Sequence, residues 1–186
     1  MISRLLVFAA VVAFSSAPLA QPTPKRFAIA GHGTLVLNVP AEWRVADKAT
    51  AAPPAVALIV GPATGDSFNL QMTAVWLEPA KRAELTPEAI RERVQATSKD
   101  LLKQAVEKEA QLIELRGKQA LGYYFSLTDR ASQNTGTDYK HIAEGTVTVG
   151  EVVLIFTFLH REPGTPAKDQ ALQIVREAAY VKEPGK

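Results

Sequence analysis

The chain is predicted to be a single α+β domain in which an antiparallel β-sheet is flanked by helices. Three observations lead to this prediction. Apolar segments of strand length follow one another with short turns between them, two longer segments have helical periodicity, and the 186 residues include no cysteine. Short turns favour antiparallel pairing, and amphipathic helices need an apolar surface to cover. Without disulfides, the fold depends on buried apolar side chains.

Four predicted strands precede the first helix. The stretch FAIAGHGTLVLNVP contains two of them around Gly31-His32-Gly33, and Pro40 ends the second because it has no N–H to donate to a ladder. The continuous apolar run 55–60 is typical of a strand that is covered on both faces. In 67–76 apolar and polar residues alternate, which predicts a strand with one face in the core.

The first helix is predicted to span 87–109. Thr86-Pro87 opens it, because a threonine hydroxyl caps the free N–H groups and proline fits the first helical position. Four further strands follow, at 111–116, 120–128, 139–149 and 152–160. The second helix begins at Thr165-Pro166 by the same device. The predicted order is therefore four strands, a helix, four strands and a helix.

Residues 1–20 have the pattern of a secretory signal peptide. Arg4 precedes the apolar run 5–14 and small residues lead to Ala20; the run is too short to cross a bilayer comfortably. The rest of the chain divides into a flexible lead-in at 21–26, a single domain at 27–182 and a tail at 183–186. Because a lipoprotein anchor requires cysteine, we predict a periplasmic or secreted protein without stable membrane insertion.

Several segments together resemble the PsbP-like superfamily. They are 35–45 (LVLNVPAEWRV), the strand 68–76, the helix 87–109 and the later GYYFSL, EGTVTVGEVVLIFTF and ALQIVREAA. Their order is similar to that of DcrB-like bacterial periplasmic proteins, which share the fold with the photosystem II extrinsic protein and a Ran-binding factor. The resemblance implies a PsbP-like α/β/α sandwich with a binding or accessory role. It carries over no site residue, because there is no shared catalytic motif to match, and it does not identify the partner.

The hairpin 139–160 is predicted to place two histidines opposite each other. If Gly150 and Glu151 form a two-residue turn, His141 faces His160 with about 4.5–5.5 Å between their Cβ atoms. Asp138 is close in sequence. Two imidazoles and a carboxylate suit a transition metal, so His141, His160 and Asp138 are the candidate metal ligands. The alternative is that both histidines cap the end of the core and bind nothing.

The polar faces of the strands suggest another surface. Residues that share a face within their own strand are Asn69, Gln71 and Thr73, then Ser126 with Thr128, and Thr146 with Thr148. If these strands are neighbours, they form a hydroxyl- and amide-rich surface for a polar ligand; an ordinary solvated sheet face gives the same pattern. The polar loop 129–138 is likewise either a recognition loop or a solvated connection.

Trp43, in LNVPAEW, follows the proline that ends a strand. It either lines a binding site or closes one end of the core. We favour the core, because Leu37 and Val39 point inward just before it, and we expect Trp76 to be its packing partner.

The sequence contains none of the common catalytic motifs. Gly-x-Ser-x-Gly, His-Glu-x-x-His, a phosphate-binding glycine loop and a cysteine nucleophile are all missing. Basic and acidic residues are interspersed and the formal net charge is +2, which argues against nucleic acid binding. We therefore predict an exported, non-enzymatic accessory domain of the bacterial envelope that binds an envelope protein and uses no cofactor. The alternative is a binder of a metal ion or small polar ligand near His141 and His160.

Overall fold

The computed structural model describes residues 22–48, 54–131 and 138–183. The predicted signal peptide, most of the loop 129–138 and residues 184–186 lie outside this part. The described strands are β1 (Thr23–Ile29), β2 (Gly33–Val39), β3 (Trp43–Lys48), β4 (Ala55–Pro62), β5 (Phe68–Trp76), β6 (Ile113–Arg116), β7 (Ala120–Thr128), β8 (His141–Val149), β9 (Val152–His160) and β10 (Ala179–Val181). The described helices are α1 (Pro79–Ala83), α2 (Pro87–Leu102) and α3 (Pro166–Arg176).

The strands form two antiparallel sheets. The small sheet has three strands in the order β1-β2-β10, and the large sheet has seven in the order β3-β4-β5-β9-β8-β7-β6. Every strand pair in both sheets is antiparallel, as the short connections predict. The predicted α+β class with an antiparallel sheet flanked by helices is therefore confirmed.

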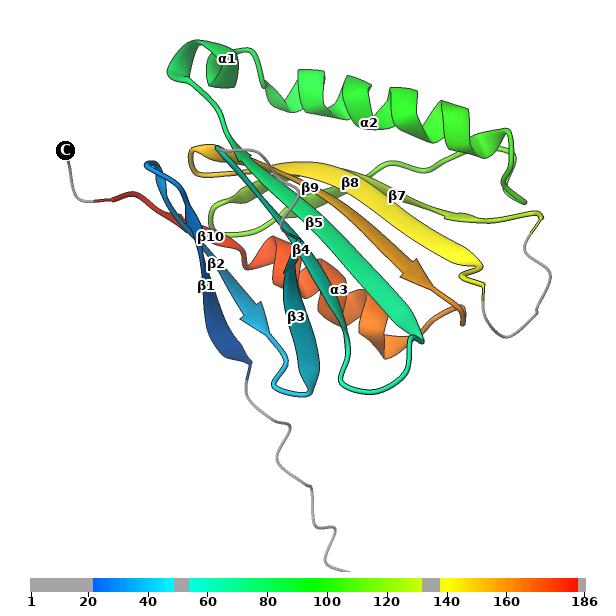
Figure 1. The fold of residues 1–186 in the computed structure, drawn as a ribbon. Coiled ribbons are helices and arrows are strands. Elements are labelled where there is room, and N and C mark those ends of the chain that lie inside the picture. The colour runs from blue at the N-terminus through cyan, green and yellow to red at the C-terminus, as the bar shows by residue number, and fades with distance from the viewer. Residues whose placement is uncertain (1–21, 49–53, 132–137, 184–186) are drawn as a thin grey trace, which may run out of the picture.

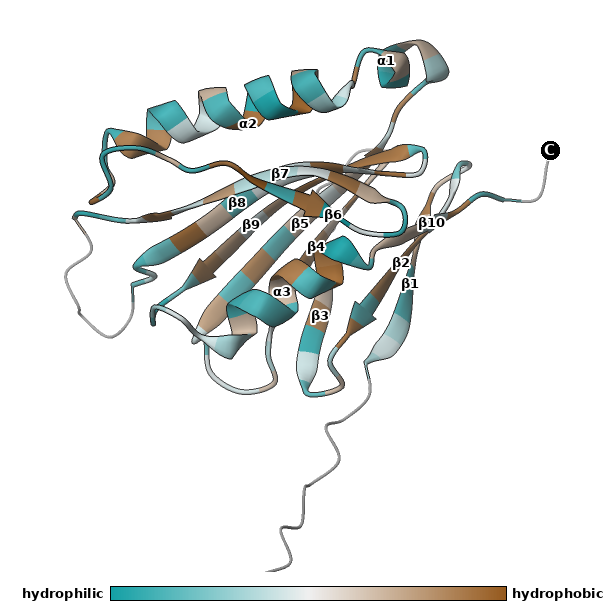
Figure 2. Cartoon of the chain, turned by 180° about the vertical axis from the view of Figure 1, so that it is seen from behind, coloured by the Kyte–Doolittle hydropathy of each residue, from teal (hydrophilic) through white to brown (hydrophobic). Residues whose placement is uncertain are grey.

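The large sheet lies between two layers (Figure 1). On one face α2 packs over β7 and β8, where Ile90 and Val94 contact a smaller core with Phe125 and Leu127. On the other face α3 and the small sheet enclose the main core, to which the apolar stripe of α3 contributes (Figure 2). None of the described helices is long and apolar enough to cross a membrane.

The β8–β9 hairpin has the predicted register. Gly150 has a φ of 59°, a left-handed conformation that glycine adopts without steric cost and that this two-residue turn needs. Val149 pairs with Val152, and at the far end His141 pairs with His160. The prediction that the two histidines face each other is therefore confirmed.

Glu151, the second residue of that turn, links separate parts of the fold. Its carboxylate accepts hydrogen bonds from the Trp76 indole N–H at 3.2 Å and from the Lys182 ammonium at 3.0 Å. It also forms an ion pair with Arg82 at 3.2 Å. The hydrogen bond from Lys182, then that from Trp76, lowers the pKa of Glu151 to about 2. This carboxylate thus connects β5, α1 and the end of the chain to the hairpin.

Two element boundaries differ from the prediction, and three elements are new. The lead-in 21–26 does not stay outside the fold: β1 begins at Thr23, because its backbone pairs with β2 as far as Val39. Helix α2 ends at Leu102 instead of 109, since the chain turns there and the Val106 N–H donates to the Thr128 carbonyl. The strands β3 and β10 and the helix α1 were not predicted. β3 and β10 are stabilised by pairing with β4 and β2, which short sequence windows do not show.

Trp43 belongs to the core, as expected, but its partner is different. Its side chain is 6% exposed, and its ring lies 4.4 Å from that of Phe68, between centroids. Trp76 is at the opposite end of β5, where it stacks on His32 at 3.8 Å. The expected contact between the two tryptophans is therefore wrong, because the β3–β4 register places Trp43 opposite Pro62.

Candidate functional site

The strand ends farthest from the β8–β9 turn carry the candidate site. The register of four neighbouring strands places Phe68, His160, His141 and Thr128 in one row across the sheet. The His160 ring stacks on His141 with 5.0 Å between ring centroids, and on Phe158 with 5.1 Å. An aromatic stack thus leads from the main core to the sheet end.

His160 is the most buried polar side chain at this end, with 3% of its surface exposed. Its Nδ1 lies 2.7 Å from the carbonyl oxygen of Glu162. A carbonyl only accepts hydrogen bonds, so Nδ1 carries the proton and Nε2 has a free lone pair. Burial lowers the pKa of His160, the bond to Glu162 opposes this effect, and His141 and Lys168 lower the pKa further. The ring is therefore neutral near pH 7.

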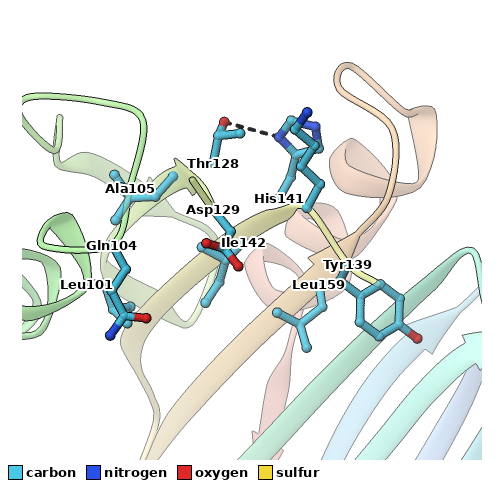
Figure 3. A pocket seen from close by; sticks show the side chains of 11 residues that line it. Leu101, Gln104, Ala105, Thr128, Asp129, Tyr139, His141, Ile142 and Leu159 are labelled. Atoms are coloured by element: carbon cyan, nitrogen blue, oxygen red, sulfur yellow. Dashed lines mark hydrogen bonds between the residues drawn. The ribbon is translucent and has the colours of Figure 1, made fainter. Parts of the chain in front are cut away.

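His141 is half-buried beside Thr128 (Figure 3). Its Nδ1 is 3.2 Å from the Thr128 hydroxyl, and this contact fixes the orientation of the ring. Burial lowers the pKa of His141 and Lys140 adds to this effect, whereas the Glu107 carboxylate raises it. Both histidines therefore act as neutral imidazoles in this environment, able to donate or accept a hydrogen bond.

Glu107 supplies a carboxylate next to the two rings. It lies in the turn that follows α2, and its Oε2 accepts a hydrogen bond from the Thr128 backbone N–H at 2.8 Å. Burial is the largest influence and raises the pKa of Glu107. The hydrogen bonds from Thr128 and the attraction to His141 act the other way and prevail, so the pKa lies below its ordinary value. This carboxylate is ionised at neutral pH.

Two pockets open at the sheet end, one on each side. The α2-side pocket, drawn in Figure 3, has a volume of about 170 Å³ and lies between the end of α2 at Leu101 and the strand residues Ile142 and Leu159. The α3-side pocket has a volume of about 210 Å³ and its wall includes Lys168 and His160. Both pockets reach His141 and Thr128, so these residues separate two small cavities.

The α3-side pocket contains polar groups that lack protein partners. The Ser126 Oγ, in its wall, has no accessible surface and no hydrogen bond. Lys168, at the start of α3, has no ion pair among the described residues. A buried hydroxyl without a partner costs free energy, roughly 1–3 kcal/mol, unless water or a ligand supplies the hydrogen bond.

The structure brings together two of the three predicted metal ligands. His141 and His160 are stacked, whereas Asp138 is an exposed residue before β8. Within the described residues, no group of three His, Cys, Asp or Glu side chains is placed to hold a metal ion. Metal binding by His141, His160 and Asp138 therefore stays a prediction that the geometry does not favour.

Sequence reasoning missed Glu107 and Lys168 as neighbours of the histidines. Glu107 was assigned to the helix, and only its end at Leu102 moves the carboxylate to the strand ends. Lys168 lies near the histidines because of the way α3 packs on the sheet. Sequence periodicity does not define that packing. Thr128 was within reach of prediction, because the β7–β8 register places it opposite His141.

The predicted polar sheet face exists in part. Asn69, Gln71 and Thr73 on β5 share the α2 side with Thr146 and Thr148 on β8, and β9 lies between them. Ser126 and Thr128 lie on the opposite side, at the α3-side pocket.

Glu144, on β8, also lies on this polar face. It is half-buried and pairs with Thr157 on β9. Its carboxylate accepts a hydrogen bond from the Thr157 hydroxyl at 3.5 Å. Burial raises the pKa of Glu144, against the smaller effect of that hydrogen bond. The backbone of Glu144 pairs with Phe125 of β7, the strand on which α2 packs.

Comparison with known proteins shows similarity of fold without similarity of sequence. No protein-family model matches the chain, and no curated protein shows significant sequence similarity to it. The solution structure of cyanobacterial PsbP from Synechocystis sp. PCC 6803 superposes with a TM-score of 0.53 at 14% identity, covering 92% of this chain and 98% of that one. A Bacteroides thetaiotaomicron crystal structure gives 0.50 at 15% identity, covering 82% of this chain and 47% of that one.

This chain therefore spans about half the length of the Bacteroides protein, and nearly all of the cyanobacterial one. LpqN of Mycobacterium tuberculosis, described as involved in cell envelope biogenesis, superposes less well, with a TM-score of 0.40 at 17% identity, covering 87% of this chain and 91% of that one. The molecule is thus an α+β domain with an antiparallel sheet between helical layers. More specifically, it has the PsbP-like fold that its sequence pattern predicts.

Proposed function

We propose that this chain is an exported, non-enzymatic domain that binds another protein of the bacterial envelope as an accessory factor. Export rests on the signal-peptide pattern of residues 1–20. The accessory role rests on the lack of catalytic motifs in the sequence and on one structural observation, the partly open face of the large sheet.

On its α2 side the large sheet is only half covered by helix. α2 packs on β7 and, less extensively, on β8, and no described helix packs extensively on β4, β5 or β9 from that side. The exposed rows mix apolar and polar groups: Ile59 lies beside Gln71, and Thr73 lies beside Ile155. These side chains are all half-buried, so each keeps part of its surface accessible to a partner. Mixed composition of this kind is typical of non-obligate protein interfaces.

The test is affinity capture from envelope extracts at physiological salt with a matched pair of variants. Thr73→Arg places a long charged side chain in the middle of the open face. Ala96→Arg places the same group on the exposed side of α2 and serves as the control. We expect the wild type and the control to retain one reproducible partner, and Thr73→Arg to lose it while its circular dichroism spectrum is unchanged.

Two outcomes contradict the proposal. Repeated recovery of no partner by the wild type would refute protein binding itself. Equal capture by the Thr73→Arg variant would refute the open sheet face as the interface.

A further inference from the structure

The α3-side pocket has the size of a small-molecule site. It is bounded by the ends of β7, β8 and β9 and by the segment from Pro163 to Lys168 that begins α3. Its volume of about 210 Å³ is well above the space that a single water molecule needs. A tetrahedral ion of five heavy atoms therefore fits.

The pocket holds two opposite charges, Lys168 and the ionised Glu107 carboxylate, so an occupant must satisfy both. The Lys168 ammonium lines the cavity without an ion pair among the described residues, and its charge reaches both histidine rings, whose pKa values it lowers. The start of α3 adds the partial positive charge of a helix N-terminus. A metal cation would find no set of three His, Cys, Asp or Glu ligands in the described chain.

The same pocket also presents hydrogen-bond acceptors. His160 Nε2 has a free lone pair, because Nδ1–H is committed to the Glu162 carbonyl. Glu107 lines the pocket as an ionised carboxylate. Acceptors repel an anion that has no proton of its own, but they bind one that carries O–H groups. The combination thus selects an oxyanion that is still protonated at neutral pH.

We propose that the α3-side pocket binds hydrogen phosphate, with the Lys168 ammonium offsetting its charge and His160 Nε2 and Glu107 accepting hydrogen bonds from its O–H groups. The ligand is the free ion, because the phosphate group of a monoester, with a second pKa of about 6, has mostly lost its O–H proton at pH 7. Sulfate has the same shape but no proton near pH 7, so the pocket distinguishes the two. This site is independent of the open sheet face, which lies on the other side of the large sheet.

The test uses the purified domain in chelator-containing buffer, titrated with inorganic phosphate, sulfate or glycerol phosphate at constant ionic strength. Heat of binding and the ¹⁵N shift of His160 Nε2 are the two readouts, because phosphate and sulfate both raise thermal stability nonspecifically. We expect saturable phosphate binding that shifts the His160 signal, and at least tenfold weaker binding of sulfate. Glycerol phosphate, which has mostly lost its O–H proton at pH 7, should bind more weakly than the free ion, and equal affinity would contradict selection by that proton.

Lys168→Met is the principal variant, and Lys99→Met is its control on the exposed face of α2. We expect Lys168→Met to weaken phosphate binding at least tenfold and Lys99→Met to leave it unchanged. Equal affinity for sulfate, equal weakening by the two lysine variants, or no shift of the His160 signal would each overturn the proposal. None of these results affects the protein-capture test, so the two proposals fail separately.

Discussion

Replacement of Trp43 by alanine is the sharpest test of the packing described here. The side chain is 6% exposed, with its ring against Phe68 at the open end of the main core. Burial of a tryptophan removes roughly 150–250 Å² from water, which corresponds to roughly 4–6 kcal/mol at about 25 cal/mol per Å². Alanine replacements of buried aromatic residues cost about 3–5 kcal/mol, because neighbours relax only in part. We expect Trp43→Ala to lower the unfolding free energy by about 4 kcal/mol.

The measurement is urea unfolding followed by far-ultraviolet circular dichroism, with the thermal midpoint as a second readout. For a domain of this size the midpoint falls by about 2–4 °C per kcal/mol, so a decrease of about 8–16 °C is expected. The control is Arg44→Ala, which changes the next residue of β3, an exposed one, and should stay within about 0.5 kcal/mol. If Trp43→Ala unfolded within about 1 kcal/mol of the wild type while partner capture disappeared, Trp43 would be a binding residue.

Three further predictions concern titrating groups and metal. The pKa of Glu151 is held at about 2 against its ordinary 4.5, chiefly by Lys182, so its contribution to stability is present above pH 4.5 and is lost as the pH falls towards 2. Glu151→Gln should therefore flatten the acid side of a plot of urea midpoint against pH, and an unchanged slope would contradict this. The pKa of His160 is lowered in the folded chain from its ordinary value of 6.5. Below about pH 6.5 the unfolded chain therefore binds a proton at this histidine more readily than the folded chain does. Stability should then fall from pH 7 to about 5, and less so in His160→Gln; identical profiles would refute it. Zinc at modest excess should leave the melting temperatures of the wild type and His141→Ala unchanged, and a rise in the wild type alone would restore the predicted metal set with His160 and Asp138.

Short-range sequence patterns predicted much of the fold and two residues of the candidate site, His141 and His160. The alternation along 68–76 identified the core face of β5, and Gly150 defined the hairpin register that brings His141 and His160 together. Both signals operate over a few residues, where backbone geometry links sequence directly to structure. The metal hypothesis also required a third ligand. The position of such a ligand depends on contacts between segments that are distant in the sequence.

The parts that sequence reasoning missed depend on such distant contacts. β10 consists of three residues and exists because β2 offers its edge, and β3 forms by pairing with β4. A strand of this length has little intrinsic preference to form alone. The sequence pattern leaves open whether Ser126 belongs to a ligand surface or to a solvated sheet face; it lies in the wall of the α3-side pocket, because α3 packs on that side of the sheet.

The sequence by itself determined the α+β class, the antiparallel hairpins, the helix starts at Thr86-Pro87 and Thr165-Pro166, and the core position of Trp43. These features follow from side-chain periodicity and from backbone restrictions at proline and glycine, which act locally. The tertiary structure alone decided that Trp43 packs on Phe68, that Glu107 and Lys168 approach the paired histidines, and that one half of the large sheet stays without a covering helix. Each of these depends on how strands pair or where helices dock, which is set by the shape and burial of the assembled core and not by any single segment.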